Sequence, residues 1–238
     1  MTCTLDTMQL ERLLDKIREK FEPQFEELAV DGQTLHLISV SNMQSHLDEL
    51  IARQGINDPL IDLPLWAKVW PASLVAGRFI RRLEPQGKSL LEIGAGCGAG
   101  GLIAARYGLS RVLLSDINED ALLFAKANVL RNGLHAIVET CRVDVRATRL
   151  EERFDFILAS EILFLEELHR PILKFLSHHL APSGKAVFCA DLTWCQKAFF
   201  KLAARDFSIQ EHTVGVRSAN DEGQEERRAY ALHFLEMK

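Results

Sequence analysis

Glycines and a carboxylate meet in one short stretch of this chain, between residues 90 and 101. The apolar run Leu90–Ile93 contains Glu92, and glycines follow at positions 94, 96 and 98. Glycine has no Cβ and tolerates positive φ, so such a run lets the backbone turn tightly and approach a bound molecule closely. The stretch predicts a buried strand, a ligand-binding turn and then the start of a helix.

The charge of Glu92 distinguishes between two nucleotide-like cofactors. Gly94, Gly96 and Ala99 match the bare dinucleotide pattern G-x-G-x-x-A, in which the turn holds a pyrophosphate. A carboxylate at position 92 would repel a pyrophosphate but attract an ammonium or sulfonium group, by about 4 kcal/mol at a separation of about 4 Å and an effective dielectric near 20. We therefore expect S-adenosylmethionine rather than NAD. In the alternative, Glu92 is a solvated strand end and the glycines only help the helix to pack.

Acidic residues also follow the next predicted strands. The run Arg111–Asp116 ends in a carboxylate about twenty residues beyond the glycines, where it can accept both ribose hydroxyls of either cofactor. Asp144 follows a third strand, where it could accept from an adenine amino group or cap a helix. Ser160 and Glu161 follow a fourth strand. Ligands bind at the carboxyl ends of parallel strands, so we expect a crevice for adenosine and a cation at this edge.

The elements that must position these residues alternate along the chain. Leucines and Ile17 at helical spacing predict an amphipathic helix over 7–20, and Asp31-Gly32 predicts a hairpin between strands 25–30 and 34–40. A helix over 44–53, ended by Asn57-Asp58-Pro59, and a helix reaching residue 83 precede the glycine turn. The pattern then predicts helix 119–131, strands 137–143 and 154–159, helix 166–180, strand 185–190, helix 193–205, and strands 207–216 and 227–236.

This alternation predicts an α/β fold. We expect a doubly wound, mostly parallel sheet with helices on both faces and a C-terminal antiparallel hairpin. The length of 238 residues suits one such domain with an N-terminal extension. We assign residues 1–62 to the extension, as a lid or brace, and residues 63–238 to the ligand-binding domain.

Composition limits the compartment and the partners. The formal net charge is -5 without a block of lysine and arginine, which disfavours a nucleic-acid surface. Five scattered cysteines without a C-x-x-C pair indicate reduced thiols in a cytoplasmic protein. We expect no metal, and we assign His178-His179 to capping of a helix end at the surface.

The N-terminal residues 1–18 mix acids and bases without a long apolar core, so neither a signal peptide nor a membrane span is expected. No heptad pattern or long apolar edge indicates an interface between copies, and a monomer is expected.

With these residues in place, the sequence resembles the seven-strand S-adenosylmethionine-dependent methyltransferases, and among them the protein lysine methyltransferases. The resemblance covers about residues 63–200, and it is carried by Trp70-Pro71-Ala72, Glu92–Gly98, Asp116, Asp144 and Ile157–Phe164. It implies a Rossmann-like methyltransferase fold with seven strands. Asn-Pro-Pro-Tyr, typical of many adenine and glutamine amide methyltransferases, is absent after the fourth strand.

The resemblance also implies roles for individual residues. It places Trp70 at the border of the cofactor, Gly94, Ala95 and Gly96 around the methionine part, Asp116 on the ribose, and Asp144, Val145 and Ser160 beside the adenine. The family's D-x-x-Y/F element falls on Glu161–Phe164, where glutamate replaces aspartate and its longer arm can shift the substrate amine.

These assignments lead to a hypothesis of in-line methyl transfer to a lysine of a protein substrate. Catalysis would come mainly from alignment of the reactants. Glu161 would orient the lysine and help it to lose a proton, while Phe164 and Trp194 would line its channel. In the alternative, Glu161 is a helix cap or first-turn acid. Two other functions stay open, a small-molecule amine or hydroxyl methyltransferase and a non-catalytic binding module with this fold.

Overall fold

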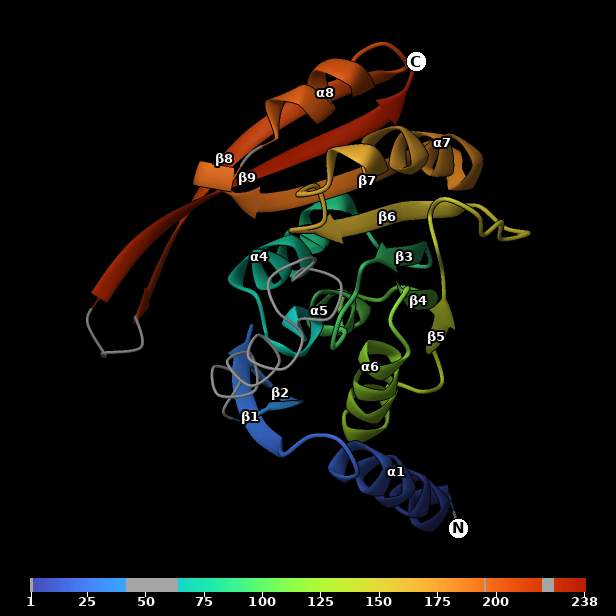
Figure 1. Cartoon of the computed structure of the whole chain (residues 1–238), viewed down its shortest axis with the longest axis vertical. Helices are drawn as coiled ribbons and strands as arrows, with labels where there is room; N and C mark the ends of the chain where they lie inside the picture. The colour runs from blue at the N-terminus through green and yellow to red at the C-terminus, as the bar shows by residue number, and fades with distance from the viewer. Residues whose placement is uncertain (1, 42–63, 195, 220–224) are drawn as a thin grey trace, which may run out of the picture.

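The computed structural model describes residues 2–41, 64–194, 196–219 and 225–238, and its centre is a seven-stranded sheet in the order β5-β4-β3-β6-β7-β9-β8 (Figure 1). β5, β4, β3, β6 and β7 pair in parallel, and β9 is antiparallel to both of its neighbours. The predicted mostly parallel sheet with a C-terminal hairpin is confirmed. Its strands are β3 (Ser89–Ile93), β4 (Arg111–Asp116), β5 (Val138–Arg142), β6 (Phe154–Ser160), β7 (Leu180–Asp191), β8 (Phe207–Ala219) and β9 (Glu225–Met237).

Helices cover both faces of this sheet, as the alternating pattern predicts. Neighbouring residues of β3 face opposite sides, so Leu90 belongs to one buried cluster and Leu91 to the other. The Leu90 cluster packs under α4 (Pro71–Ile80), α5 (Ala99–Ala105) and α6 (Glu119–Arg131), and the Leu91 cluster under α7 (His169–His179) and α8 (Lys197–Ala203). The chain also contains four short 3-10 turns in its described part: η1 (Leu65–Ala67), η2 (Arg81–Leu83), η3 (Glu166–Leu168) and η4 (Leu192–Trp194).

Several boundaries differ from the sequence prediction, most of all those of the first helix, which spans Thr2–Arg18, of β7 and of α8. β7 begins at Leu180 rather than at residue 185: Leu180 pairs with Phe154 and Lys185 with Phe156, so Pro182-Ser183-Gly184 lie in an irregular stretch within the strand. A Cβ at Gly184 would lie 2.9 Å from the Asp155 carbonyl oxygen, so this glycine allows the neighbouring strand to approach. The helix expected over 193–205 spans only Lys197–Ala203.

The N-terminal segment forms a helix and a hairpin that pack on α6. α1 (Thr2–Arg18) is followed by β1 (Pro23–Val30) and β2 (Gln33–Val40), which pair in antiparallel through Asp31-Gly32. Both turn residues have positive φ, 48° and 79°, which is the type I′ geometry favoured by Asp-Gly. The helix expected over 44–53 and the Asn57-Asp58-Pro59 turn lie outside the described residues.

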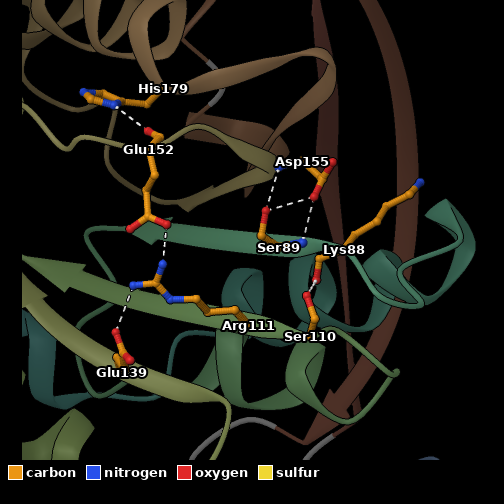
Figure 2. Close-up of polar contacts among 8 residues, drawn as sticks. All are labelled: Lys88, Ser89, Ser110, Arg111, Glu139, Glu152, Asp155 and His179. Atoms are coloured by element: carbon orange, nitrogen blue, oxygen red, sulfur yellow. Dashed lines mark hydrogen bonds and ion pairs between the residues drawn. The ribbon is translucent and has the colours of Figure 1, made fainter.

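Polar side chains tie the strands together at the end of the sheet opposite the glycine turn (Figure 2). Asp155 accepts hydrogen bonds from the backbone N–H and the hydroxyl of Ser89, at 2.8 and 2.9 Å. The guanidinium of Arg111 pairs with Glu139 and with Glu152. These contacts join β3 to β6, and β4 to β5 and to the segment before β6.

His179 is buried, so the prediction that it caps a helix end at the surface is wrong. Its side chain is buried against Phe175, with ring centroids 4.3 Å apart, and its Nδ1 lies 3.2 Å from the Glu152 carbonyl oxygen (Figure 2). Burial lowers the pKa of this imidazole. The periodicity of α7 directs residue 179 toward the sheet, which a reading of the His-His pair alone misses.

Candidate functional site

The predicted site residues gather at the carboxyl ends of four adjacent strands, β5, β4, β3 and β6. The chain order along the sheet reverses between β3 and β6, which is where open α/β sheets bind ligands. Gly94 follows β3 and Ile162 follows β6, and a Cβ on Gly94 would lie 2.6 Å from Ile162 Cγ2. The two loops therefore meet at this reversal point.

Positive φ angles explain why glycines occupy the turn after β3. Gly94, Gly96 and Gly98 have φ values of 64°, 55° and 85°, all in the left-handed region. A side chain at Gly96 would also lie 2.7 Å from the Trp66 carbonyl oxygen. That oxygen accepts a hydrogen bond from the Cys97 N–H at 2.9 Å, so the segment before α4 is attached to the turn. Ala95 is buried within it.

Glu92 lies beneath the glycine turn with 1% of its surface exposed, which contradicts the alternative of a solvated strand end. Its Oε2 accepts from the Gly101 N–H at 2.7 Å, while its Oε1 has no hydrogen-bond partner within the described ranges. A Cβ on Gly100 would lie 2.5 Å from Oε1, so the glycines that begin α5 leave room for this carboxylate. Burial raises the pKa of Glu92 to about 8, and the nearby Asp116 charge adds to the shift.

Asp116 ends β4 and is joined to the glycine turn. Its Oδ2 accepts from the Gly96 N–H and its Oδ1 from the Asn118 N–H, both at 2.9 Å. Burial raises the pKa of this carboxyl. Each oxygen keeps a second lone pair for another donor, so the ribose role implied by the resemblance is compatible with these bonds and stays a prediction.

Asp144 follows β5 and is engaged by its own loop. Arg146 forms a two-pronged ion pair with it, Nε to Oδ1 at 2.9 Å and Nη2 to Oδ2 at 3.0 Å, and the Arg146 N–H also donates to Oδ1. The hydrogen bond from the guanidinium lowers the pKa of Asp144. No helix begins here, since residues 145–147 form a turn, so the alternative of a helix cap is wrong and the carboxylate holds this turn instead. The adenine contact stays a prediction. Val145 is half-buried beside it.

The two tryptophans before α4 differ in their surroundings. Trp66 packs edge-on against Phe21 and Phe124, with ring centroids 5.4 and 5.2 Å away, as part of the core. Trp70 is half-buried immediately before α4, and its indole N–H donates to the Leu65 carbonyl at 2.8 Å. Both tryptophans are half-buried, so exposure does not distinguish them, and the place of Trp70 at the cofactor border stays a prediction.

Glu161 joins the ends of β6 and β7 in an unusual backbone conformation. Its φ is 53°, a left-handed value that costs a residue with a Cβ about 1 kcal/mol or more. Its N–H donates to the Cys189 carbonyl at 3.0 Å, and its Oε1 accepts from the Asp191 N–H at 2.8 Å. Burial raises the pKa of this carboxyl. Ser160, the last residue of β6, is half-buried beside it.

A cavity of about 440 Å³, including its opening to solvent, brings Glu161, Phe164 and Trp194 together. The structure brings these three residues together, and their roles stay predictions. Sequence reasoning missed other lining residues, among them Cys189, Phe200 and His233. His233 is buried and stacks on Phe200 at 3.5 Å, and burial lowers its pKa. The only signal for it was a histidine inside the apolar strand run of β9.

The residues at the glycine turn fit the cofactor predicted from the sequence. The unpartnered Oε1 of Glu92 is a buried acceptor that a cationic ligand would satisfy, and the carboxylate of Asp116 lies beside the turn. In the described ranges no three His, Cys, Asp or Glu side chains are grouped so that they could hold a metal ion. None of the helices described there has the length and apolar character needed to cross a membrane.

Comparison with known families agrees with this arrangement. The model of a family described as "Lysine methyltransferase" matches residues 64–206, more than half of the chain. The chain belongs to the lysine methyltransferase family. The matched range contains the glycine turn, Asp116 and Glu161, whereas His233 lies outside it.

Two relatives within this set of similar proteins are protein-modifying enzymes by name. The chain is 28% identical over 153 residues to the electron transfer flavoprotein beta subunit lysine methyltransferase of Mus musculus, covering 63% of this chain and 59% of the relative. It is 32% identical over 158 residues to the protein N-lysine methyltransferase METTL21A of Danio rerio, covering 61% and 70%. The chain therefore spans about three fifths of the first relative.

Solved structures support the fold. A TehB-like SAM-dependent methyltransferase from Corynebacterium glutamicum aligns with a TM-score of 0.55 and 17% identity, covering 82% of this chain and all of that one. The ribosomal protein L11 methylase of Lactobacillus delbrueckii subsp. bulgaricus aligns with a TM-score of 0.50 and 21% identity, over 70% and 77% of the two chains. The predicted methyltransferase fold is confirmed.

Proposed function

We propose that this protein is an S-adenosylmethionine-dependent methyltransferase that N-methylates a lysine side chain of a protein substrate. The observation that carries this proposal is the cavity in which Glu161 lies with Phe164 and Trp194, next to the loop that meets the glycine turn. A cavity lined by a carboxylate and by aromatic rings suits an alkyl stem that ends in an ammonium group. The family and the names of its relatives support the same reaction.

The residues proposed to hold the cofactor are those that surround the glycine turn. Asp116 would accept from the ribose, the open backbone around Gly94–Gly96 would lie against the methionine part, and Glu92 would balance its positive charge. When bound, S-adenosylmethionine supplies a methyl group already activated on a sulfonium. Trp70, Asp144, Val145 and Ser160 would complete the border of the site.

Glu161 is proposed to position the lysine and to favour loss of its proton. The Asp191 N–H donates a hydrogen bond to Glu161 Oε1 and so restricts rotation of the carboxylate. The second oxygen, Oε2, is therefore held in one direction as well. A lysine ammonium drawn to this carboxylate must lose a proton before its nitrogen can act as a nucleophile. Because the methyl donor is activated, we expect alignment of the amine to contribute more than acid-base chemistry.

Two other functions have specific support and specific tests. The same cavity could take a small amine or hydroxyl compound, since its walls are mainly apolar. A binding module without catalysis could also keep the whole arrangement. An NAD-linked oxidoreductase is disfavoured by the buried Glu92 beneath the turn, because this carboxyl can ionise favourably beside a cationic ligand but gains nothing beside a pyrophosphate.

Labelling of a cell extract tests the activity. The full chain is incubated with S-adenosylmethionine carrying a labelled methyl group and with the extract, and modified proteins are mapped by mass spectrometry. A labelled lysine supports the proposal. Label only in small molecules favours the amine or hydroxyl enzyme, and absence of label from several extracts favours the binding module.

Two variants separate orientation of the substrate from binding of the cofactor. Glu161→Gln keeps the length of the side chain but removes its charge, so we expect turnover to fall by about 10² or more with unchanged cofactor affinity. Asp116→Ala should instead abolish cofactor binding in calorimetry. Glu166→Gln changes an exposed acid on η3 and serves as the matched control. Wild-type turnover in Glu161→Gln would remove Glu161 from the mechanism.

We also propose that the protein acts in the cytoplasm as a monomer. Cys97, Cys141 and Cys189 are free in the described part of the chain, which supports a reducing compartment. Fractionation of cells and light scattering of the purified protein would test the two statements.

A further inference from the structure

Exposed apolar side chains lie at the cavity and in the turn η4, which carries Trp194 of the cavity wall. Six large hydrophobic residues in the described ranges are between 44% and 68% exposed. Phe164, Leu192 and Trp194 are three of them, and we call these three the apolar rim. The others, Met8, Phe25 and Ile117, belong to three separate parts of the chain.

Hydrogen bonds hold the turn that carries Leu192 and Trp194 beside Glu161. The Asp191 N–H donates to Glu161 Oε1 at 2.8 Å, and Leu192 is the next residue. The Asp191 side chain accepts from the N–H and the hydroxyl of Thr193, at 2.9 and 2.7 Å. Residues 192–194 therefore form a fixed turn rather than a loose loop, with Leu192 and Trp194 exposed on it.

The apolar rim and the cavity would contact different parts of a substrate. Phe164 and Trp194 line the cavity and are also exposed to solvent, whereas Leu192 is not among the lining residues. In the proposed complex the lysine side chain occupies the cavity. Leu192 lies outside the cavity and would contact the substrate residues that flank this lysine. Apolar surface held rigidly around a binding site marks a place where a partner excludes water.

We infer that the apolar rim docks the segment of a protein substrate that flanks the target lysine, and that this segment carries apolar side chains next to that lysine. The inference rests on the proposed function and adds the chemistry of the substrate around the modified residue. The charge pattern supports it, because Glu161 is the acidic side chain that lines the cavity and suits one cation, while the apolar rim suits uncharged neighbours.

The test uses Leu192, because it lies outside the proposed channel. The substrate is the protein identified by extract labelling, and rates are measured with S-adenosylmethionine carrying a labelled methyl group. We expect Leu192→Ser to raise KM for this protein about tenfold and to leave kcat within about twofold. Leu192→Met should restore the wild-type KM, because it keeps an apolar side chain of similar volume.

Controls distinguish this inference from the proposed function. Met8→Ser and Phe25→Ser remove similarly exposed apolar side chains of the N-terminal segment. Both variants should leave KM unchanged. A wild-type KM in Leu192→Ser, with normal labelling by the wild type, overturns the docking role alone. Absence of any labelled lysine with the wild-type enzyme overturns the proposed function as well. A modified lysine whose sequence neighbours are all charged also contradicts the inference.

Discussion

Glu92 combines a role in the fold with a charge that burial opposes. The carboxylate is enclosed by the start of α5, holds one N–H of that helix, and keeps one oxygen without a partner among the described residues. Its pKa of about 8 means that the folded protein without ligand holds a proton here at pH 7. The ordinary value is 4.5. This residue's contribution to stability is therefore fully present below pH 4.5 and is lost as pH rises through 8.

Binding of a cationic cofactor should reverse this protonation. A positive charge near Glu92 favours the carboxylate, so we expect S-adenosylmethionine binding at pH 7 to release close to one proton more in the wild type than in Glu92→Gln. Calorimetry in buffers of different ionisation enthalpy measures this difference. Any proton released by the cofactor's own amino group is the same for both proteins and cancels in the difference. Equal proton release by the two proteins would show that Glu92 does not interact with the charge of the ligand.

At the scale of single elements, α6 connects the N-terminal hairpin to the glycine turn. The Asn128 side chain is fully buried, accepts from the Ile38 N–H at 2.7 Å, and donates to the carbonyls of Ile38 and Cys97 at 3.3 and 2.9 Å. One amide thus joins β2, α6 and the ligand-binding loop. Asn132, one turn later, bonds the backbone of His36 in the same manner.

We therefore expect Asn128→Ala to lower the free energy of unfolding by about 2 to 4 kcal/mol, because it leaves buried backbone groups without partners. The loss should be measured by chemical denaturation. Lys126→Ala changes an exposed residue of the same helix and should cost little. A comparable loss in both variants would show that the bonds of Asn128 are not the cause.

At the scale of the whole molecule, the N-terminal segment and the methyltransferase domain share one apolar core. Leu35 and Ile38 of β2 belong to the same buried cluster as Leu90 of β3 and Phe124 of α6. This continuity supports a brace rather than a detachable lid, and we propose that residues 1–62 act as one.

A shared core should unfold in a single step. Leu35→Ala removes a fully buried side chain and is expected to cost about 2 to 5 kcal/mol in one cooperative transition seen by every probe. Phe25→Ala, on the exposed side of the same hairpin, is the control and should have a smaller effect. Two separate transitions in the wild type would contradict the brace.

Local chemistry explains why much of this molecule could be predicted. Helix 119–131 matches α6 at both ends. Asn118 caps its start, accepting from the N–H groups of Asp120 and Ala121 at 2.8 and 3.0 Å, and Gly133 with a φ of 65° follows its end. The Asp31-Gly32 hairpin follows from two residues that accept positive φ. β7 was harder to delimit, since Gly184 marks a close contact between strands rather than a turn.

The alternation of strands and helices, the glycine turn and the acids at one edge of the sheet follow from local pattern, because each depends on periodicity or on the φ preference of single residues. The burial of Glu92 under α5 and the position of His233 at the Glu161 cavity follow only from how the elements pack. β9 lies between β7 and β8 although it follows both in the chain. Contacts of this kind join residues far apart in sequence, and sheet order and packing decide them rather than any local pattern.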